Sequence, residues 1–331
     1  MAYTLAQLAK LETNPLTKYV IMNLLRQIKI METLPFENVT ALKVSALTWR
    51  TLPSVAFRDI NGTHTEGTDG DVSEVWESLY ILGGLVAFDR VFSKVTNTIK
   101  DPKQMQMDMK IMSLALTFND YFINGDLAVD PLGFEGLKKR IDNSPARQKV
   151  LPTASGATAL DVTASVANVN RFWTAMERAH RSCNNGEVSA IMCNEDMLLG
   201  LGRSLRFINA SAGNFLDVTK DSFERQILTY KGAPILDAGL KKDQSTEIIT
   251  DTETAADAGS DGTSMYFMSF GMEQGITGIQ LAPGLEVIPD AQKDVATVDK
   301  TLIEWVLGLA GFGSYGVSRL WNILAPDTWT A

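Results

Sequence analysis

Residues 114–140 read LALTFNDYFINGDLAVDPLGFEGLKKR, a helical pattern that ends at a turn and is followed by a short restart of the chain. From Pro102 to Phe122 apolar residues recur at intervals of three and four, which predicts a helix of about 20 residues, roughly 30 Å long. An Asn-Gly-Asp turn at 124–126 breaks this helix, and a short Gly-Leu motif at 136–137 restarts the chain. We therefore expect one long helix that ends in a defined turn.

Two apolar stripes run along the predicted helix. The first contains Met105, Met109, Met112 and Leu116, and the second contains Ile111, Ala115, Phe118 and Phe122. Clustered methionines can bind soft metals, but no histidine or cysteine lies near them, and methionine in a helix more often fills a core. We expect these methionines to be buried in the core.

The residues before this helix show two different periodicities. Residues 4–33 carry apolar side chains at helical spacing on both sides of Asn14-Pro15, which predicts an N-terminal arm of amphipathic helices. Its apolar face needs a partner, in the same chain or in another one. Apolar and polar residues alternate from Ala41 to Phe57, and a second strand-like run covers Val72–Phe92. Residues 59–71 between them read DINGTHTEGTDGD, so we expect a long two-stranded hairpin with a polar tip. Because an isolated hairpin is marginal in water, this one should lie against another surface.

The second half of the chain mixes helices and strands. After a linker at 151–156, we expect an amphipathic helix from Asp161 to about Arg181, a buried strand at 187–193 and a helix capped by Asn194. Further strands are predicted at 223–236 (a pair), 265–270, 277–281, 285–288 and 301–321. This order predicts an α+β fold with helices packed on a mixed sheet.

Composition and charge limit the classes of function. The 331 residues are 45% hydrophobic with a mean hydropathy near zero, as expected for a globular protein with a sizeable core. A formal net charge of -9 argues against a protein that mainly binds nucleic-acid phosphates. Residues 1–50 carry six basic and three acidic side chains, whereas residues 243–299 carry eleven acidic and one basic. The acidic stretch is either a solvated surface or a face that attracts the basic arm of a neighbouring subunit.

Targeting signals are not evident. The start MAYTLAQLAK lacks the basic and then apolar pattern of a signal peptide, and two cysteines, Cys183 and Cys193, fit synthesis in a reducing cytoplasm. The most apolar stretch, Leu302–Val317, is short, rich in glycine and interrupted by Glu304. We therefore expect no transmembrane segment.

Motifs with catalytic or ligand chemistry are weak. His64 lies in the expected hairpin tip and His180 on a helix, so a nucleophilic triad is improbable. Cys183 and Cys193 have no second cysteine pair to form a zinc site, and we expect buried thiols. The glycines of GLAGFG at 308–313 lack the spacing of a phosphate loop and suit a closely packed strand.

One pair of carboxylates could in principle hold a cation. Asp257 and Asp261 lie in a glycine-rich loop, but without the ligand spacing of an EF-hand, so a solvated loop is the better explanation. The sequence thus predicts no catalytic residue, no cofactor-binding residue, no metal site and no cofactor.

Several segments resemble, in order and spacing, the major capsid proteins of tailed bacteriophages that have the Hong Kong 97-like fold. They are LPSVAFRDIN (52–61), ESLYILGGLVAFDR (77–90), FNDYFINGD (118–126), FEGLKKRI (134–141), SFERQILTYKGAPILDAG (222–239), MYFMSFGMEQGITGIQ (265–280) and IEWVLGLAGFGSYGVSRLWNI (303–323). Each segment is weakly specific alone, but together they extend the resemblance over nearly the whole chain.

The resemblance implies an α+β Hong Kong 97-like organisation with five parts. They are an N-terminal arm (1–40), an E-loop β-hairpin (41–92), a peripheral domain with the spine helix (93–150), an axial domain with connecting strands (151–290) and a C-terminal strand that returns to the peripheral domain (291–331). In this family the arm and the hairpin reach over adjacent subunits. The apolar faces expected on both elements would then be covered by neighbouring copies.

The function implied by the resemblance is that of a major capsid protein, not an enzyme. The chain would self-assemble as pentamers and hexamers into the icosahedral head around the double-stranded DNA of a tailed phage, with only weak, non-specific DNA contact and no membrane. Further expected partners are a separate scaffolding protein, a portal protein and, in some heads, decoration proteins. The expected location is the virion, after assembly in the cytoplasm of the host bacterium.

Some family members form covalent cross-links between a hairpin lysine and an asparagine of another subunit. The segment from Arg58 to Asp71 contains no lysine, so we expect no cross-link at the tip.

Two alternatives remain open. One is an encapsulin-like nanocompartment shell, which has the same fold but encloses cargo enzymes. The other, from a different class, is an α/β hydrolase or sugar-modifying enzyme that uses paired carboxylates such as Glu195 and Asp196. A deep pocket that contains acids with perturbed pKa values would favour the enzyme.

Overall fold

The N-terminal helices pack within their own chain. The computed structural model describes residues 3–64, 67, 70–89, 102–152, 159–207, 216–220, 224–254, 261–273, 275–289, 298–313, 315–326 and 329. Helices α1 (Leu5–Leu11), α2 (Pro15–Gln27) and α3 (Ile30–Thr33) confirm the two amphipathic helices around Asn14-Pro15. The Asn14 side chain accepts a hydrogen bond from the Leu16 amide and caps α2.

Of the two possible partners of the arm, the structure shows the same chain, so the expectation that neighbouring copies cover its apolar face is wrong. Val20, Leu24 and Leu25 of α2 are buried in the same core as the long helix α4 (Pro102–Asn124). The sequence pattern could not reveal this, because an amphipathic stripe looks the same whether its partner belongs to the same chain or to another.

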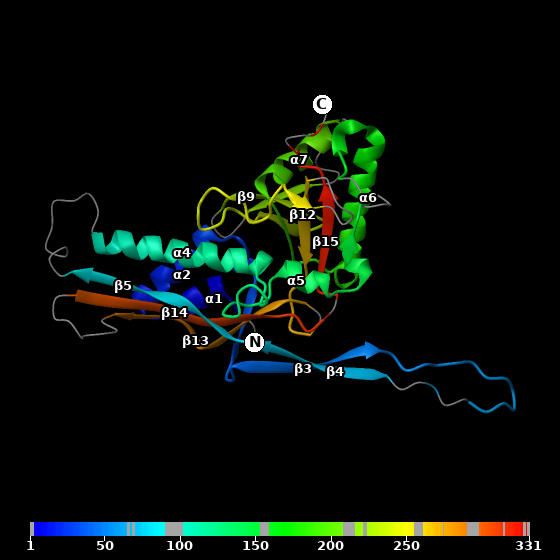
Figure 1. The fold of residues 1–331 in the computed structure, drawn as a ribbon, viewed down its shortest axis with the longest axis horizontal. Helices are drawn as coiled ribbons and strands as arrows, with labels where there is room; N and C mark the ends of the chain where they lie inside the picture. The colour runs from blue at the N-terminus through cyan, green and yellow to red at the C-terminus, as the bar shows by residue number, and fades with distance from the viewer. Residues whose placement is uncertain are drawn as a thin grey trace.

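Helix α4 confirms the predicted long helix, but only one of its two stripes is core. Its second stripe, including Phe118 and Phe122, is buried, whereas Met105 is 54% and Met109 61% exposed. The prediction that these methionines fill the core is therefore wrong for Met105 and Met109. The helix lies on one face of a sheet, so the stripe that points away from the sheet meets solvent (Figure 1).

A five-stranded sheet lies under these helices. Its strands, in spatial order, are β1 (Tyr3–Thr4), β2 (Pro35–Val39), β13 (Thr277–Pro289), β14 (Val298–Ala310) and β5 (Tyr80–Asp89). Phe118 of α4 stacks on Trp305 of β14, with ring centroids 5.8 Å apart. This aromatic contact, with Phe36 against the same Trp305, lies at the centre of the first core.

The expected hairpin is shorter than the sequence pattern suggested. Strands β3 (Lys43–Thr51) and β4 (Asp71–Ser78) form a separate two-stranded sheet, which extends away from the rest of the molecule (Figure 1). The alternation that predicted a strand up to Phe57 continues beyond the last strand residue, Thr51. The run from Val72 to Phe92 is not one hairpin strand either, because the chain passes from β4 through Leu79 into β5 of the five-stranded sheet.

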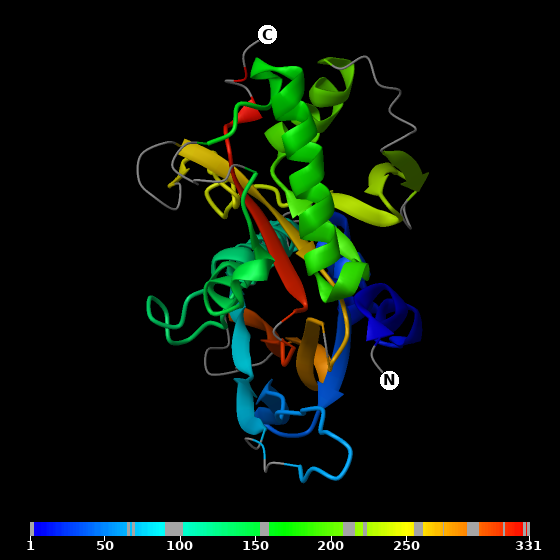
Figure 2. The ribbon, with the colours of Figure 1, turned by 90° about the vertical axis from the view of Figure 1, so that its right-hand side faces the viewer.

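An eight-stranded sheet organises the second core. Its main path is β6 (Lys149–Val150), β15 (Val317–Ile323), β12 (Asp261–Met268), β7 (Ala190–Cys193), β10 (Ala233–Asp237), β9 (Gln226–Tyr230) and β8 (Asp217–Lys220), and β11 (Glu253–Thr254) pairs with β12. Helix α6 (Val166–Ser182) runs beside β15, while α7 (Glu195–Phe207) packs on the same core (Figure 2). This sheet mixes parallel and antiparallel pairs, as predicted.

Several local predictions in this half are confirmed. Asn194 caps α7 by accepting a hydrogen bond from the Met197 amide, and β7 is fully buried. Strands β9 and β10 meet at Lys231-Gly232, where both residues have positive φ, as a tight hairpin turn requires. Helix α6 starts later than predicted, because its cap is the Ser165 hydroxyl and not Asp161.

The C-terminal segment contributes to both sheets. The single strand expected over 301–321 is two strands, with β14 in the five-stranded sheet and β15 in the eight-stranded sheet. Helix α5 (Leu137–Asp142) follows the turn after α4 and lies near the point where the two sheets meet (Figure 1). The predicted linker falls mainly on residues 153–158, outside the described residues. Within the described part of the chain, every helix is too short or too polar to cross a bilayer.

Candidate assembly surface

The loop at the end of the hairpin exposes apolar side chains. We call residues 52–64 the tip loop. Leu52, Val55, Phe57 and Ile60 are 74–107% exposed. The first three were expected in a strand, and Ile60 belongs to the segment expected to form a polar tip. Contiguous exposed apolar groups mark interaction surfaces in soluble proteins. The tip loop is therefore the first candidate for contact with another molecule.

Only the root of the hairpin is anchored. Val44 and Ala46 of β3 and Val75 of β4 pack against a small cluster of Ile279, Ala310 and Phe312. On the distal part, Leu47 and Val72 remain exposed, and at the root Trp76, opposite Ser45, is exposed as well. The distal half of the hairpin therefore lacks a covering surface within the described part of its own chain. Because a hairpin of this length is unstable without further contacts, we expect another molecule to cover it.

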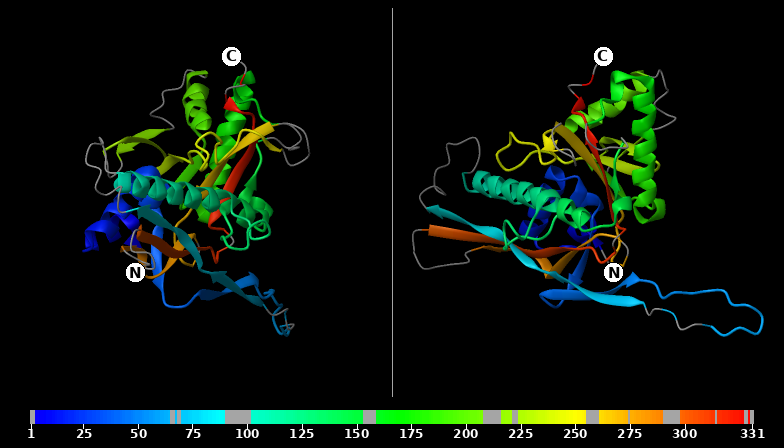
Figure 3. Two further views of the ribbon diagram at one scale, coloured as in Figure 1. Left: turned by 60° about the vertical axis from the view of Figure 1, so that its left-hand side comes forward. Right: turned by 45° about the vertical axis from the view of Figure 1, so that its right-hand side comes forward.

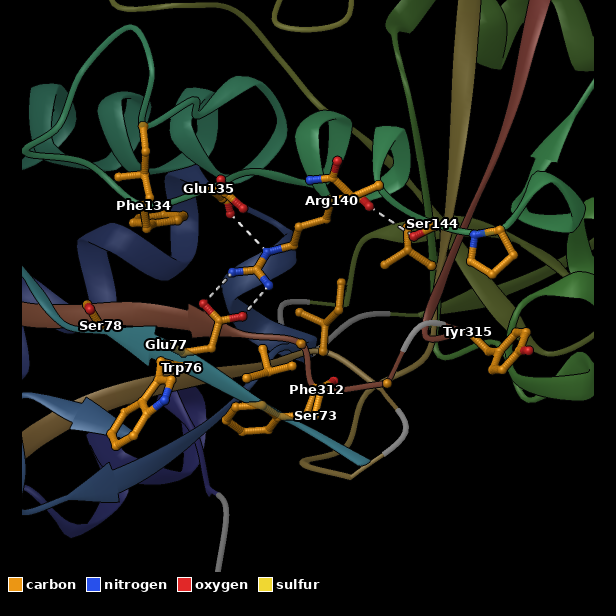
Figure 4. A pocket seen from close by; sticks show the side chains of 18 of the residues that line it. Ser73, Trp76, Glu77, Ser78, Phe134, Glu135, Arg140, Ser144, Phe312 and Tyr315 are labelled. Carbon is orange, nitrogen blue, oxygen red and sulfur yellow. Dashed lines mark hydrogen bonds and ion pairs between the residues drawn. The ribbon is translucent and has the colours of Figure 1, made fainter. Parts of the chain in front are cut away.

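An ion pair attaches the hairpin root to α5 (Figure 4). Arg140 Nη1 lies 2.5 Å from Glu77 Oε1, and Arg140 Nη2 lies 3.0 Å from Glu77 Oε2. The same guanidinium donates to the carbonyl oxygens of Glu135 at 3.0 Å and Leu309 at 2.7 Å. A bidentate pair with two added backbone bonds restricts the angle between its elements. Arg140 thus connects β4, α5 and β14.

A groove runs beside this ion pair. It has a volume of about 1140 Å³ and lies between the hairpin root and the body of the molecule, with Trp76, Phe134 and Phe312 among its lining residues (Figure 4). Ser144 and Tyr315 extend the groove toward the eight-stranded sheet. Its large open volume suits an extended segment of a macromolecule better than a small ligand.

A second surface is the uncovered face of the five-stranded sheet. Helices α2 and α4 lie on one side of β5 and β14, and the described elements leave the opposite side open over the first half of β14 (Figures 1 and 3). We call this side the outer sheet face. It is formed by the side chains that alternate with the buried ones, namely Ile81, Gly83, Leu85 and Ala87 of β5, Lys300, Leu302, Glu304 and Val306 of β14, and Glu286 and Ile288 of β13.

The sheet register arranges this face in rows. Ile81 lies opposite Val306, and Leu85 lies opposite Leu302, which in turn is opposite Ile288. Between these apolar rows, Gly83, Glu304 and Glu286 form a central row. Ile81 is 69% exposed, and Leu85 and Ile288 are each 41% exposed. The outer sheet face is therefore a flat apolar surface with two adjacent carboxylates at its centre.

The two histidines and two cysteines are not brought together as a nucleophilic site. His64 lies in the exposed tip loop, whereas His180 is buried on α6, edge-on to Tyr230 with ring centroids 5.8 Å apart. Burial, with a smaller contribution from Lys231, lowers the pKa of His180. Cys183 and Cys193 are buried free thiols, as predicted.

The carboxylates considered for enzyme chemistry lie in a structural cluster. Glu195 and Asp196 are in the first turn of α7, and the Asn194 side chain donates to Glu247 at 3.0 Å and to Asp251 at 2.6 Å. Burial raises the pKa of Glu247 and of Asp251. None of these residues lines the groove described above. The cluster connects the start of α7 to the loop before β11.

A glycine of the 308–313 segment serves close strand packing. Gly308 packs closely on another strand, since a Cβ atom there would lie 2.5 Å from the Ser78 carbonyl oxygen, as expected for a closely packed strand. Asp257 and the side chain of Asp261 lie outside the described residues. Among the residues described, no group of three or more histidine, cysteine or acidic side chains is placed to hold a metal ion.

Sequence reasoning missed the ion pairs that hold the elements together. Besides Arg140 and Glu77, the buried Arg319 of β15 pairs with Glu253 at 2.7 Å, and Lys138 of α5 lies 3.2 Å from the same carboxylate. Burial opposes ionisation of Glu253, but Arg319 and Lys138 outweigh it and lower the pKa. A lone arginine within an apolar strand sequence was the available signal, because a buried charge needs a partner.

Comparison with solved structures identifies the fold. The chain resembles the SrpI encapsulin of Synechococcus elongatus with a TM-score of 0.60, 14% identity and coverage of 92% of this chain and 89% of that one. It resembles the capsid of cyanophage A-1(L) with a TM-score of 0.57, 15% identity and 93% coverage of both chains. The capsid of the native GTA particle gives a TM-score of 0.55, 14% identity and coverage of 91% and 90%.

These likenesses define the class of fold. The chain has the Hong Kong 97-like capsid fold, which confirms both the resemblance seen in the sequence and the predicted α+β class. No family model and no curated protein matches the sequence. At 14–15% identity the structural likeness establishes the fold alone.

Proposed function

We propose that this protein is a structural shell subunit, the major capsid protein of a tailed phage, which self-assembles into the icosahedral head around double-stranded DNA. The observation that carries the proposal is the pair of surfaces on one chain, an exposed apolar tip loop at the end of an extended hairpin and an uncovered sheet face at the other side of the molecule. Different surfaces that bind each other head to tail generate closed rings when the rotation closes.

The five-part division remains part of the proposal, with two adjustments from the fold. The N-terminal arm contributes its helices to the core under α4, and the E-loop corresponds to β3, the tip loop and β4. The five-stranded sheet with α4 would be the peripheral domain, and the eight-stranded sheet with α6 and α7 the axial domain. Under this division β14 returns to the peripheral domain, and β15 continues into the axial domain.

The proposed partners follow from this role. The main partner is the protein itself, in pentamers and hexamers, with a separate scaffolding protein, a portal protein and, in some heads, decoration proteins. Contact with packaged DNA would be weak, because a chain with a net charge of -9 repels phosphates. The proposed location is the virion, after assembly in the host cytoplasm, and the proposed role is structural, not enzymatic.

An encapsulin-like shell is the second candidate. The likeness to the SrpI encapsulin, with a TM-score of 0.60, supports it as well as it supports a capsid. Particles purified from the native source distinguish the two. Nuclease-protected double-stranded DNA inside the particles would support the phage head, whereas a protein cargo without DNA would support the nanocompartment.

Electron microscopy of the purified protein tests the shared claim. We expect closed, uniform shells formed by this chain. A protein that stays monomeric at high concentration, with or without a scaffold supplied, would contradict both the capsid and the encapsulin functions.

A further inference from the structure

Two glutamates face each other on the outer sheet face. Glu286 of β13 and Glu304 of β14 are direct partners in the antiparallel register. Both are half-buried, and their neighbours Trp305 and Val287 point into the core, so the two carboxylates share the opposite side. Like charges directly opposite each other destabilise an antiparallel pair. Within the described part of the chain, neither carboxylate has an ion pair.

The surroundings of this pair favour one cation at a defined place. Gly83 occupies the next position of the central row, so no side chain covers Glu304 from the β5 side. The apolar rows of Ile81 with Val306 and of Leu85 with Leu302 flank the carboxylates. A cation carried between apolar groups would therefore complement this face in both charge and hydrophobicity.

The tip loop carries such a cation. Arg58 is the only lysine or arginine between Arg50 and Arg90, in a segment with seven acidic residues. Its guanidinium donates to the backbone carbonyl oxygens of Asp59 at 3.4 Å and Gly62 at 3.0 Å, so the charge is held in the turn of the loop. Phe57 and Ile60 beside it are fully exposed.

The occupant must come from a second copy of the chain. The hairpin carries the tip loop away from the five-stranded sheet, and both views place the two at opposite ends of the molecule (Figures 1 and 3). A net acidic hairpin approaching an acidic row would be repelled unless a basic residue met that row, and Arg58 is the one lysine or arginine of the tip loop. The charges of the two surfaces thus favour a second copy as the partner, and they fix the position of the tip loop on the outer sheet face of that copy.

We propose that Arg58 of one copy binds between Glu286 and Glu304 on the outer sheet face of the next copy, with Phe57 and Ile60 against the flanking apolar rows. The inference rests on the proposed shell function and specifies which contact fixes the hairpin on its neighbour. Arg58 acts as a specificity residue, because a guanidinium can donate to two carboxylates at once.

A charge exchange tests the contact. The variants R58E and E304R are each expected to raise the protein concentration needed for half-assembly by about tenfold or more, because each places like charges across the interface. The double variant R58E/E304R restores opposite charges and should assemble within about threefold of the wild type. R171E, which makes the same charge change on an exposed part of α6, is the matched control and should assemble like the wild type.

Sedimentation of the assembled fraction against concentration provides the readout, with thermal melting of each variant as a check on folding. Normal assembly of R58E, or a double variant as weak as the sum of the single losses, would overturn the inference while leaving the shell function intact. A wild-type protein that forms no particles would instead overturn the proposed function and the inference with it.

Discussion

Arg140 illustrates how one side chain can fix the orientation of an element. Its side chain is 13% exposed, and its guanidinium donates hydrogen bonds to Glu77, Glu135 and Leu309. Replacing it in R140A leaves the Glu77 carboxylate without its partner in a half-buried place. We expect R140A to lower the free energy of unfolding by about 2 kcal/mol, measured by urea denaturation of the unassembled chain.

The control for R140A is K139A on the same helix. Lys139 lies 3.2 Å from Asp126, but these side chains are 37% and 27% exposed, more than those of Arg140 and Glu77, so solvent screens the pair more strongly. We expect a much smaller loss of stability for K139A. Equal losses for the two variants would show that the Arg140 bonds contribute no more than a surface pair.

The two thiols should be chemically inert in the folded chain. Burial raises the pKa of Cys183 to about 12 and raises that of Cys193 as well. The thiolate is the reactive form, so an aromatic disulfide reagent should react with neither cysteine until the protein unfolds. Rapid reaction of one thiol in native buffer would mean that its pocket opens without global unfolding.

His180 should make stability depend on mildly acidic pH. Burial, helped by Lys231 and Arg181 and opposed by Glu177, lowers its pKa from the ordinary 6.5, and Tyr230 packs against its ring. At mildly acidic pH the His180 imidazole is therefore protonated more readily in the unfolded chain than in the folded chain. The free energy of unfolding consequently falls as the pH drops below about 6.5.

The variant H180Q checks this assignment. Denaturant titrations from pH 7.5 to about 5 should show a smaller loss of stability for H180Q than for the wild type. H64Q changes the other histidine, in the exposed tip loop, and should keep the wild-type slope. Identical slopes for wild type and H180Q would contradict the assignment.

At the scale of elements, exposed and buried phenylalanines should behave oppositely. Phe57 is fully exposed in the tip loop, so F57S should leave the free energy of unfolding of the monomer within about 0.5 kcal/mol while reducing assembly. F118A removes a buried ring of the first core and should cost about 3–5 kcal/mol. An F57S protein that assembles normally would remove the tip loop from the interface.

Helices and isolated strands were predictable because their signals are local. The apolar spacing of α4, the cap at Asn194 and the turn at Lys231-Gly232 each lie within a few residues of the element they define. The segments that carry the fold resemblance were also readable in order. No local signal marked the exposure of Met105, because burial depends on which face the distant sheet occupies.

The pairing of strands was harder to predict. The alternating pattern of Val72–Phe92 gave no sign that β4 pairs with β3 while β5 pairs with β14, since alternation is the same for any partner. The apolar tip loop was readable from Val55 and Phe57, but these residues were assigned to a strand. The charge row on the outer sheet face exists only in the paired register, so sequence alone could not place it.

For the whole molecule, the absence of lysine between Arg58 and Asp71 has a direct consequence. A lysine–asparagine cross-link cannot form from this segment. Mature particles dissolved in hot detergent should therefore run on a denaturing gel as one band near 36.2 kDa. A ladder of covalent oligomers would show that another lysine reacts.

Two well-packed cores stabilise the body of each copy, but the apolar side chains at the end of the hairpin have no covering surface in the described part of the same copy. The aromatic cluster around Trp305 and the buried sheet around Phe267 account for the stability of the body. In contrast, the tip loop and the outer sheet face leave apolar surface in water at two separate ends. Association of identical copies is the arrangement that covers both surfaces together.

Sedimentation velocity of the purified full chain over a range of concentrations measures this association most directly. We predict a dominant, fast and homogeneous boundary of closed particles that grows with concentration at the expense of the 36.2 kDa monomer. A single monomer boundary that persists at high concentration, with the apolar tip loop still exposed, would contradict the proposal that this chain builds a shell.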